Sequence, residues 1–451
     1  MFMKLNIQLF NQGCWQDAAQ LNFSNPELGR HGSCVLGYEP PTYALEWMGC
    51  DDQHAVALNF PVDLMTTYRA DHWFSFLDDI MPAGASRRYW VNYLNIAHLS
   101  PAQQDFALLS KGTIAPVGNI RIKESLPEPV AGSQLDVMRF SLKDVIERDS
   151  DFMQYAQQRG AAAGGATGAG GEAPKLLLRC SAQDDIWIDT FQQDLTNQDQ
   201  HYLVKFPRGN RTKDDSDILR AEFRFYHELT AMGIDTISTQ AMKLYEGERY
   251  PSLWLPRFDV AFNEGVIERF GLESVYSIVE KQPGASLNHF DVLRTLTNKL
   301  ERQYAVVEGK QQFDRQAFVI EWVKRDLLNV AFGNSDNHGR NTSLIKKPDG
   351  IWLAPVYDFA PMKADPEGIV RTITWGSPYE EAGRFDWIGI AKQLTDLAEA
   401  DAIIDALQKL AKQLSGLRER LYTRGVPERI LMMPALQLDQ LDNKLRYWQL
   451  L

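Results

Sequence analysis

The stretch GNSDNHGRN occupies residues 333–341, and VYDFAP follows at residues 356–361. Asp336 and Asn341 stand five positions apart, and Asp358 lies seventeen positions beyond Asn341. Carboxylate and amide oxygens are the hard ligands that Mg²⁺ prefers. Taken alone, the first stretch also fits a polar turn at the end of a helix, so the rest of the chain must decide its meaning.

Size and charge narrow the classes of protein. A chain of 451 residues favours two or three domains, and 44% hydrophobic with 24% charged residues is ordinary for a globular protein. The formal net charge of −12 argues against a general nucleic-acid or membrane-surface binder. We therefore expect no direct nucleic-acid binding and no membrane partner.

The cysteines and the apolar runs indicate a cytoplasmic protein. No stretch of eighteen apolar residues occurs, and the first fifteen residues are typical of a strand and not of a secretion signal. The four cysteines show neither CxxC spacing nor a zinc pattern. We expect inert thiols in a reducing compartment.

The first hundred residues alternate like strands and then become helical. LNIQLF (5–10), YALEWM (43–48) and AVALNF (55–60) are predicted strands. Residues 73–94 carry apolar side chains at helical spacing around a Pro-Ala-Gly break, which predicts that strands give way to helices.

A glycine-rich segment, GAAAGGATGAGGEAP at residues 160–174, precedes a second set of predicted strands. Its composition suits a flexible linker. Strand patterns follow at 175–180, 185–191 and 201–207, and Lys205 lies near the end of the last. A glycine-rich loop that opens a sheet carrying a lysine is also how a phosphate-covering loop is built.

The remaining chain is mainly helical. Residues 214–233 predict a helix with acidic residues at its start, a hairpin and a short crossing follow up to residue 260, and 318–334 and 403–422 are amphipathic. The sequence thus predicts an α+β fold with two lobes, a small β lobe and a large helical one.

Phosphoryl transfer from ATP explains the order of these pieces. The spacing D-x-x-x-x-N with a later strand-end aspartate matches the catalytic loop and metal segment of protein kinases. Asp336 would be the base, and Asn341 and Asp358 the Mg²⁺ ligands. Lys205 would hold the α and β phosphates, with Glu222 as its partner.

The chain also resembles the HipA-type toxin Ser/Thr kinases of bacterial toxin–antitoxin modules. The matching segments are MPAGASRR (81–88), GGEAPKLLL (170–178), LVKFP (203–207), AEFRFYHELTAMGI (221–234), LPRFD (255–259), FGNSDNHGRNTSLI (332–345) and APVYDFAP (354–361). The resemblance implies a protein-kinase-like fold with an added N-terminal β-rich subdomain and an all-helical C-terminal lobe. The implied boundaries are 1–125, 126–260 and 261–451.

The resemblance also implies an ATP- and Mg²⁺-binding site. Besides Lys205, its ATP-contacting residues would be Gly170, Gly171 and Lys175 of the loop, Pro256 and Phe258 of the hinge, and His338 and Tyr357. Relatives often place a glutamate where Pro256 stands, and proline can offer only its carbonyl to adenine.

Regulation and partners follow from the same resemblance. Relatives often carry an autophosphorylated serine where this chain has Gly168, so Thr167 is the candidate site unless the chain has no such brake. The expected substrate is a translation component such as an aminoacyl-tRNA synthetase, and the expected partner is a DNA-binding antitoxin. The alternatives are a pseudokinase that only binds, a kinase of a non-protein acceptor, and a metal-dependent hydrolase using Asp336, His338 and Asp358.

Overall fold

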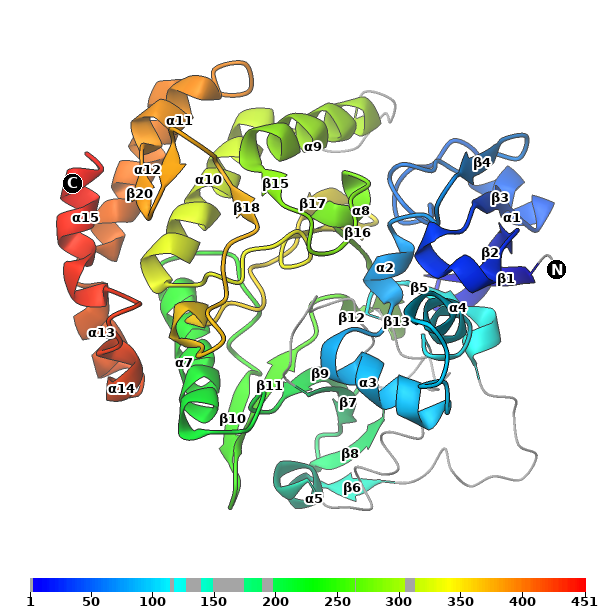
Figure 1. Ribbon diagram of the computed structural model, residues 1–451, viewed down its shortest axis with the longest axis horizontal. Helices are drawn as coiled ribbons and strands as arrows, with labels where there is room; N and C mark the ends of the chain where they lie inside the picture. The colour runs from blue at the N-terminus through cyan, green and yellow to red at the C-terminus, as the bar shows by residue number, and fades with distance from the viewer. Residues whose placement is uncertain are drawn as a thin grey trace. The chain divides into compact units, whose positions relative to one another are not determined.

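The computed structural model describes residues 3–113, 117–126, 139–148, 174–188, 198–263, 265–304 and 313–451 (Figure 1). The chain forms two compact units, each assembled from three separate segments. The first comprises Met1–Gly209, Ala241–Pro283 and Ser343–Trp352, and the second Asn210–Gln240, Gly284–Thr342 and Leu353–Leu451. The domain boundaries at residues 125 and 260 stay a prediction.

The first unit is rich in strands. Its strands are β1 (Met3–Asn11), β2 (Cys14–Phe23), β3 (Cys34–Tyr38), β4 (Thr67–Ala70), β5 (Ile120–Ile122), β6 (Phe140–Ser141), β7 (Lys175–Cys180), β8 (Asp185–Ile188), β9 (Gln200–Lys205), β10 (Lys243–Glu246), β11 (Pro251–Pro256), β12 (Val260–Asn263), β13 (Val266–Arg269), β14 (Gly271–Ser274), β16 (Ser343–Lys347) and β17 (Gly350–Leu353). Its helices are η1 (Pro26–His31), α1 (Pro41–Glu46), α2 (Leu77–Ile80), α3 (Gly84–Tyr93), α4 (Pro101–Lys111), η2 (Lys123–Ser125), α5 (Leu142–Glu147) and α8 (Val275–Ile278).

Two sheets organise this unit. The first has the strand order β4-β3-β2-β1-β5, and the second β10-β11-β9-β7-β8-β6. In β1, Leu5, Ile7 and Leu9 alternate into a core that also receives Phe106 and Leu109 of α4. This period of two is the one expected of a half-buried strand.

Two strands predicted in the N-terminal region are wrong. Residues 43–48 fall largely in α1, because Pro41 presets the first helical turn and Tyr43, Ala44 and Trp47 then contact the core at helical spacing. Residues 55–60 form an irregular buried segment with a single bridge. The N–H of Leu58 is satisfied by Glu273 Oε2 at 2.9 Å, which replaces a strand partner.

The second unit is mainly helical, with short strands beyond residue 260 as well. Its elements are α7 (Lys213–Ala231), β15 (Leu287–Asn288), α9 (His289–Tyr304), α10 (Arg315–Phe332), η4 (Met362–Ala364), β18 (Ile373–Thr374), β19 (Glu380–Glu381), β20 (Arg384–Phe385), α11 (Trp387–Gln393), α12 (Ala400–Leu414), α13 (Leu417–Thr423), α14 (Glu428–Leu431), η5 (Leu438–Gln440) and α15 (Leu441–Tyr447). Helices α10 and α12 pack side by side (Figure 1). The helix predicted over 403–422 is interrupted at Gly416, whose φ of 69° is left-handed, so α12 and α13 are separate.

Local signals fix the two longest helices of this unit. Thr212 begins α7 with a capping box in which its hydroxyl accepts the Asp215 N–H. Asp314 caps the start of α10, and Gly333 ends it with a φ of 71°. A Cβ on Gly333 would lie 2.3 Å from Leu436 Cδ2. The residue that opens the GNSDNHGRN stretch is therefore a glycine for two independent reasons.

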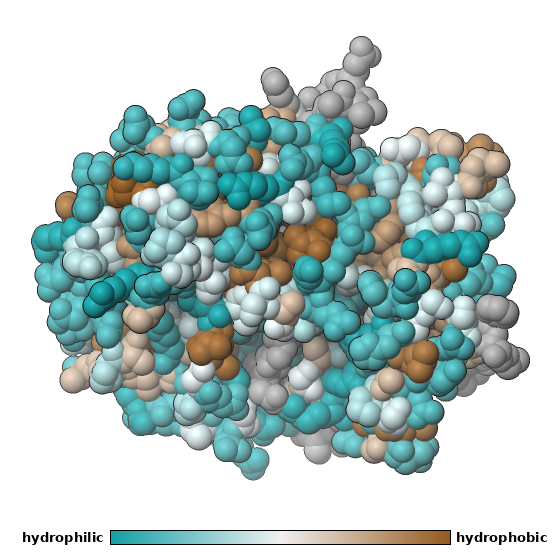
Figure 2. Space-filling model, turned by 45° about the horizontal axis from the view of Figure 1, so that its top comes forward, coloured by the Kyte–Doolittle hydropathy of each residue, from teal (hydrophilic) through white to brown (hydrophobic). Residues whose placement is uncertain are grey.

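The surface is mostly polar. Figure 2 shows one face on which hydrophilic residues dominate and hydrophobic residues gather in small patches. Across the described part of the chain, no helix has both the length and the apolar character needed to cross a membrane. The four cysteines are free thiols; Cys34 and Cys180 are buried, and Cys14 is exposed.

We expect Gly333→Ala to lower the free energy of unfolding by about 1–3 kcal/mol, since a left-handed backbone strains an alanine and the added Cβ would clash with Leu436. Gly233→Ala is the matched control, because Gly233 has a φ of 73° with nothing within 4 Å of an added Cβ. Urea unfolding of both variants should show the larger loss for Gly333→Ala. Equal losses in the free energy of unfolding would mean that the Leu436 side chain moves away from the added methyl group without destabilising the protein.

Candidate active site

A buried carboxylate anchors the loop that follows α10. Asp326 is 2% exposed and accepts hydrogen bonds from Asn337 Nδ2 at 3.1 Å and Trp375 Nε1 at 2.8 Å. The Arg371 guanidinium pairs with it at 2.8 Å. Burial alone would raise the pKa of Asp326, but Arg371 and His289 outweigh burial and hold that pKa well below its ordinary value. Asp326 is therefore a charged group inside the second unit.

The loop is held at Asn337 from two directions. Its side chain donates to Asp326, and its carbonyl accepts the N–H groups of Thr372 at 3.1 Å and Ile373 at 3.2 Å. Arg371 also pairs with Glu380 at 2.9 Å. The residue next to Asp336 is thus tied both to α10 and to the segment around β18.

Asp336 and His338 form the partly open end of this loop. The Asp336 side chain is 23% exposed, while His338 and its other neighbours in the loop are buried. His338 Nδ1 accepts the Arg340 N–H at 3.2 Å, so a neutral ring carries its proton on Nε2. That Nε2 lies 3.4 Å from Asp336 Oδ1. The arrangement leaves a carboxylate at the loop surface with an imidazole beside it.

Asn341 is oriented with one oxygen unused. Its Nδ2 donates to the Asp336 carbonyl at 2.7 Å, and its N–H donates to the His338 carbonyl at 2.9 Å. These bonds fix the amide, and its buried Oδ1 has no hydrogen-bond partner among the described residues. A buried acceptor without a donor is costly unless something positive binds it. The residue fits the role of a cation ligand.

The Asp358 segment is joined to α7 through one tyrosine. Tyr226 OH donates to Glu222 Oε1 at 3.2 Å and accepts the Phe359 N–H at 3.2 Å. Burial, followed by the charges of Glu222 and Asp358, raises the pKa of Tyr226 well above its ordinary value. Both carboxylates therefore lie near this hydroxyl. Asp358 itself has a φ of 52°, a left-handed conformation in which aspartate is enriched.

Tyr357 fastens the same segment to the loop that follows α10. Its hydroxyl is buried and donates to the Arg340 carbonyl. The structure thus brings together Asp336, His338, Asn341, Tyr357, Asp358 and Glu222 within the second unit. These residues supply carboxylate and amide oxygens, and hydrogen bonds fix the backbone of the loop that carries three of them.

The first unit carries the two predicted lysines on neighbouring strands. Lys205 of β9 is 4% exposed, and Lys175 of β7 is its paired residue in the antiparallel register. Directly opposed residues project from the same face, and like charges there are unfavourable. The register therefore places the two predicted lysines side by side on one face of the sheet.

The other predicted ATP-contacting residues divide into described and undescribed ones. Pro256 ends β11, and Phe258 follows it half-buried. Gly170, Gly171 and Thr167 lie outside the described residues. Lys205 belongs to the first unit and Glu222 to the second, so the predicted pairing of these two side chains stays a prediction.

Sequence reasoning missed the network around Asp326. Asp326 follows Trp322 by four residues, and Trp322 follows Phe318 by four, so an acid occupies the apolar stripe of α10. An acidic residue in an apolar stripe could have indicated a buried ion pair, because a buried charge needs partners. The sequence around Arg371 and Trp375 gives no sign that they are those partners.

A further group lies in the first unit. Among the described His, Cys, Asp and Glu side chains, those of Cys50, Asp52 and His54 place ligand atoms within 4.8 Å of one another. His54 Nδ1 is hydrogen bonded to Asp52 at 2.8 Å, and its ring stacks on Trp47 at 3.6 Å. These two contacts account for the arrangement without an ion.

Comparisons with known proteins identify the family and the fold of the chain. The family model described as HipA-like C-terminal domain matches residues 167–414, more than half of the chain. The chain belongs to the HipA-like family. The HipA toxin of Shewanella oneidensis MR-1, solved with HipB and operator DNA, superposes with a TM-score of 0.64 at 15% identity, covering 99% of this chain and 97% of that one. The predicted family and the α+β fold are confirmed.

Two other results complete the comparison. The Helicobacter pylori proinflammatory kinase CtkA aligns with a TM-score of 0.35 and 12% identity over 62% of this chain and 88% of that one. A search of curated protein sequences finds no match.

We expect Asp326→Ala to destabilise the second unit by about 3–5 kcal/mol, because it leaves Arg371 buried without this partner. The control is Asp396→Ala, which removes a 2.8 Å pair with Arg294 in which the Asp396 side chain is 50% exposed and should cost at most about 1 kcal/mol. Denaturant unfolding compares them. Similar losses for both variants would contradict the anchoring role.

Folding lowers the pKa of Asp326, so its contribution to the free energy of unfolding should depend on pH. That contribution is full above the unfolded pKa of about 3.9 and declines as pH falls through the folded pKa.

Proposed function

We propose that this HipA-like protein is an ATP- and Mg²⁺-dependent Ser/Thr protein kinase that modifies a cytoplasmic protein. Membership of the HipA-like family and the HipA fold support a kinase-type enzyme. The observation that carries the proposal is the Asn341 amide, which Asp336 orients while its buried Oδ1 has no hydrogen-bond partner in the described structure. A catalytic base and a metal ligand adjacent in this way suit phosphoryl transfer.

In this proposal each residue has one task. Asp336 accepts the proton of the acceptor hydroxyl, whose oxygen attacks the γ-phosphorus of ATP as ADP leaves. Asn341 and Asp358 hold Mg²⁺, which when bound would neutralise charge on the phosphate oxygens. Lys175 and Lys205 contact the phosphates, and Pro256 and Phe258 the adenine. His338 orients Asp336 from 3.4 Å.

A DNA-binding antitoxin is the proposed partner. The superposed HipA was solved with HipB and operator DNA, which supports a DNA-binding antitoxin partner for this chain. An aminoacyl-tRNA synthetase as the substrate, a cytoplasmic location and autophosphorylation at Thr167 rest on the family resemblance alone.

The rival with most support is a pseudokinase that binds nucleotide or a partner without transfer. Pseudokinases usually lack one of the charged positions, and Lys205, Asp336, Asn341 and Asp358 are all present. A kinase of a non-protein acceptor would share every residue named here, so only the acceptor distinguishes it.

Asp336→Asn should bind ATP with unchanged affinity yet transfer phosphate on the order of 10²-fold more slowly, since the base is lost while the loop bonds to its backbone remain. Calorimetry measures ATP binding, and quantitative phosphoproteomics of cells expressing each variant measures transfer. Asp349→Asn, in the exposed turn between β16 and β17, is the control. Wild-type protein that binds ATP but adds no phosphosite would establish the pseudokinase instead.

Asp358→Ala should abolish the Mg²⁺-dependent tightening of ATP binding, because a hard oxygen ligand is removed. Asn341→Leu should do the same without changing charge. Titrations of ATP with and without Mg²⁺ provide the readout, again with a substitution at Asp349 as the control. If wild-type protein binds ATP equally well in both conditions, the metal assignment is wrong.

A further inference from the structure

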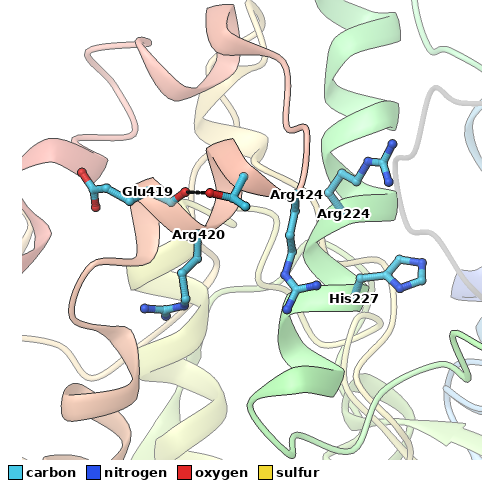
Figure 3. A pocket seen from close by; sticks show the side chains of 6 residues that line it. Arg224, His227, Glu419, Arg420 and Arg424 are labelled. Carbon is cyan, nitrogen blue, oxygen red and sulfur yellow. Dashed lines mark hydrogen bonds between the residues drawn. The ribbon is translucent and has the colours of Figure 1, made fainter.

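A pocket of about 580 Å³ opens in the second unit between α7 and α13 (Figure 3). Its lining is strongly basic. The residues are Arg224, His227, Glu419, Arg420, Thr423 and Arg424. Three of the six are arginines, and no residue proposed for phosphoryl transfer is among them.

Part of this basic charge has a structural role. Glu228 of α7 has a side chain only 2% exposed, and it accepts Arg420 Nε at 2.7 Å and Arg424 Nε. Arg420 also donates to the carbonyls of Ser415 at 2.6 Å and Gln413 at 2.5 Å. Arg420 is thus fully engaged in fastening α13 to α7. Arg424 contributes only its Nε to this contact.

The other two basic side chains lack such partners. Arg224 stacks over the Phe223 ring at 5.0 Å, and its Nε lies 3.8 Å from the position of a Cβ on Gly425. Its guanidinium forms no ion pair or hydrogen bond with the described residues. His227 Nε2 is buried and likewise has no hydrogen-bond partner in that part of the chain.

The charges around the pocket leave an excess of positive charge. The three arginines contribute three positive charges and the carboxylates of Glu228 and Glu419 two negative ones, which gives a net charge of +1 with His227 neutral. Glu228 is already paired, and the Glu419 carboxylate points away from Arg424 in Figure 3. Burial, then Arg224 and Arg424, lower the pKa of His227. Arg420 and Glu419 of α13 and Glu228 of α7 are the other charged groups at this surface. The imidazole therefore lies in a positive field that an anion would relieve.

We propose that this pocket binds the phosphoryl group of a phosphate monoester. Guanidinium forks match phosphate oxygens, and a third oxygen would give His227 Nε2 the partner it lacks. A nucleic-acid backbone fits less well, because it requires an extended basic surface, whereas this pocket has six lining residues and one of them is acidic. The inference does not depend on the proposed kinase activity.

The test titrates full-length protein with inorganic phosphate at constant ionic strength and follows the His227 imidazole by NMR. Bound phosphate should raise the His227 pKa, since an adjacent anion stabilises the imidazolium. No residue proposed for phosphoryl transfer lines this pocket, so the His227 signal is separate from the readout of the proposed function. Arg224→Gln should weaken the binding roughly tenfold.

Arg418→Gln is the matched control. It removes the same charge from α13 at a residue that pairs with Glu419 at 3.9 Å and does not line the pocket. Equal effects of the two substitutions, or no movement of the His227 pKa, would overturn the proposal.

The source of the phosphoryl group is distinguished by further probes. A phosphoserine peptide and adenosine monophosphate are compared with inorganic phosphate through the same His227 signal, and tighter binding of either supports the proposal and names the source. Competition by duplex DNA that exceeds all three would overturn it in favour of a nucleic-acid surface.

Discussion

The charge on Asp326 is the constraint on which the candidate site depends. A carboxylate that is 2% exposed is tolerable only while Arg371, Trp375 and Asn337 bind it. Those partners come from the loop and from the segment around β18, so burying one charge of α10 fixes the helix, the loop and that segment together. The carboxylate of Asp336 is then presented by a backbone that cannot shift without breaking this network.

Hydrogen bonds to the backbone fix the path of the loop before any ligand binds. The hydrogen bonds of Asn341 and Tyr357 run to backbone carbonyls of Asp336 and Arg340, and they determine chain path without consuming the Asn341 oxygen. Tyr226 does the same for the Asp358 segment through the Phe359 N–H. The fixed scaffold and the side-chain oxygens it displays are therefore separate sets of atoms.

Sequence patterns correctly predicted the elements whose conformation depends on neighbouring residues. The alternation in LNIQLF and the capped amphipathic run of α7 are properties of neighbouring residues, and both elements formed as expected. YALEWM and AVALNF failed because a proline-started turn and the buried Glu273 side chain satisfied their backbone instead. The spacing of Asp336 and Asn341 indicated the candidate site, but the partners of Asp326 lie up to 49 residues away, beyond the reach of helix or strand periodicity.

Helix α7 serves both the candidate catalytic site and the basic pocket, and helix geometry separates the two. Successive residues turn by roughly 100°, so Glu222 and Tyr226 share one face, whereas Arg224, His227 and Glu228 project from the opposite one. The first face contacts the segment after Asp358, and the second is clamped to α13 by Glu228. Because no side chain belongs to both faces, an effect of one site on the other would have to pass through displacement of α7 as a whole. The buried ion pair of Glu228 with Arg420 and Arg424 opposes that displacement, as does the hydrogen bond of Tyr226 with the Phe359 N–H on the other face.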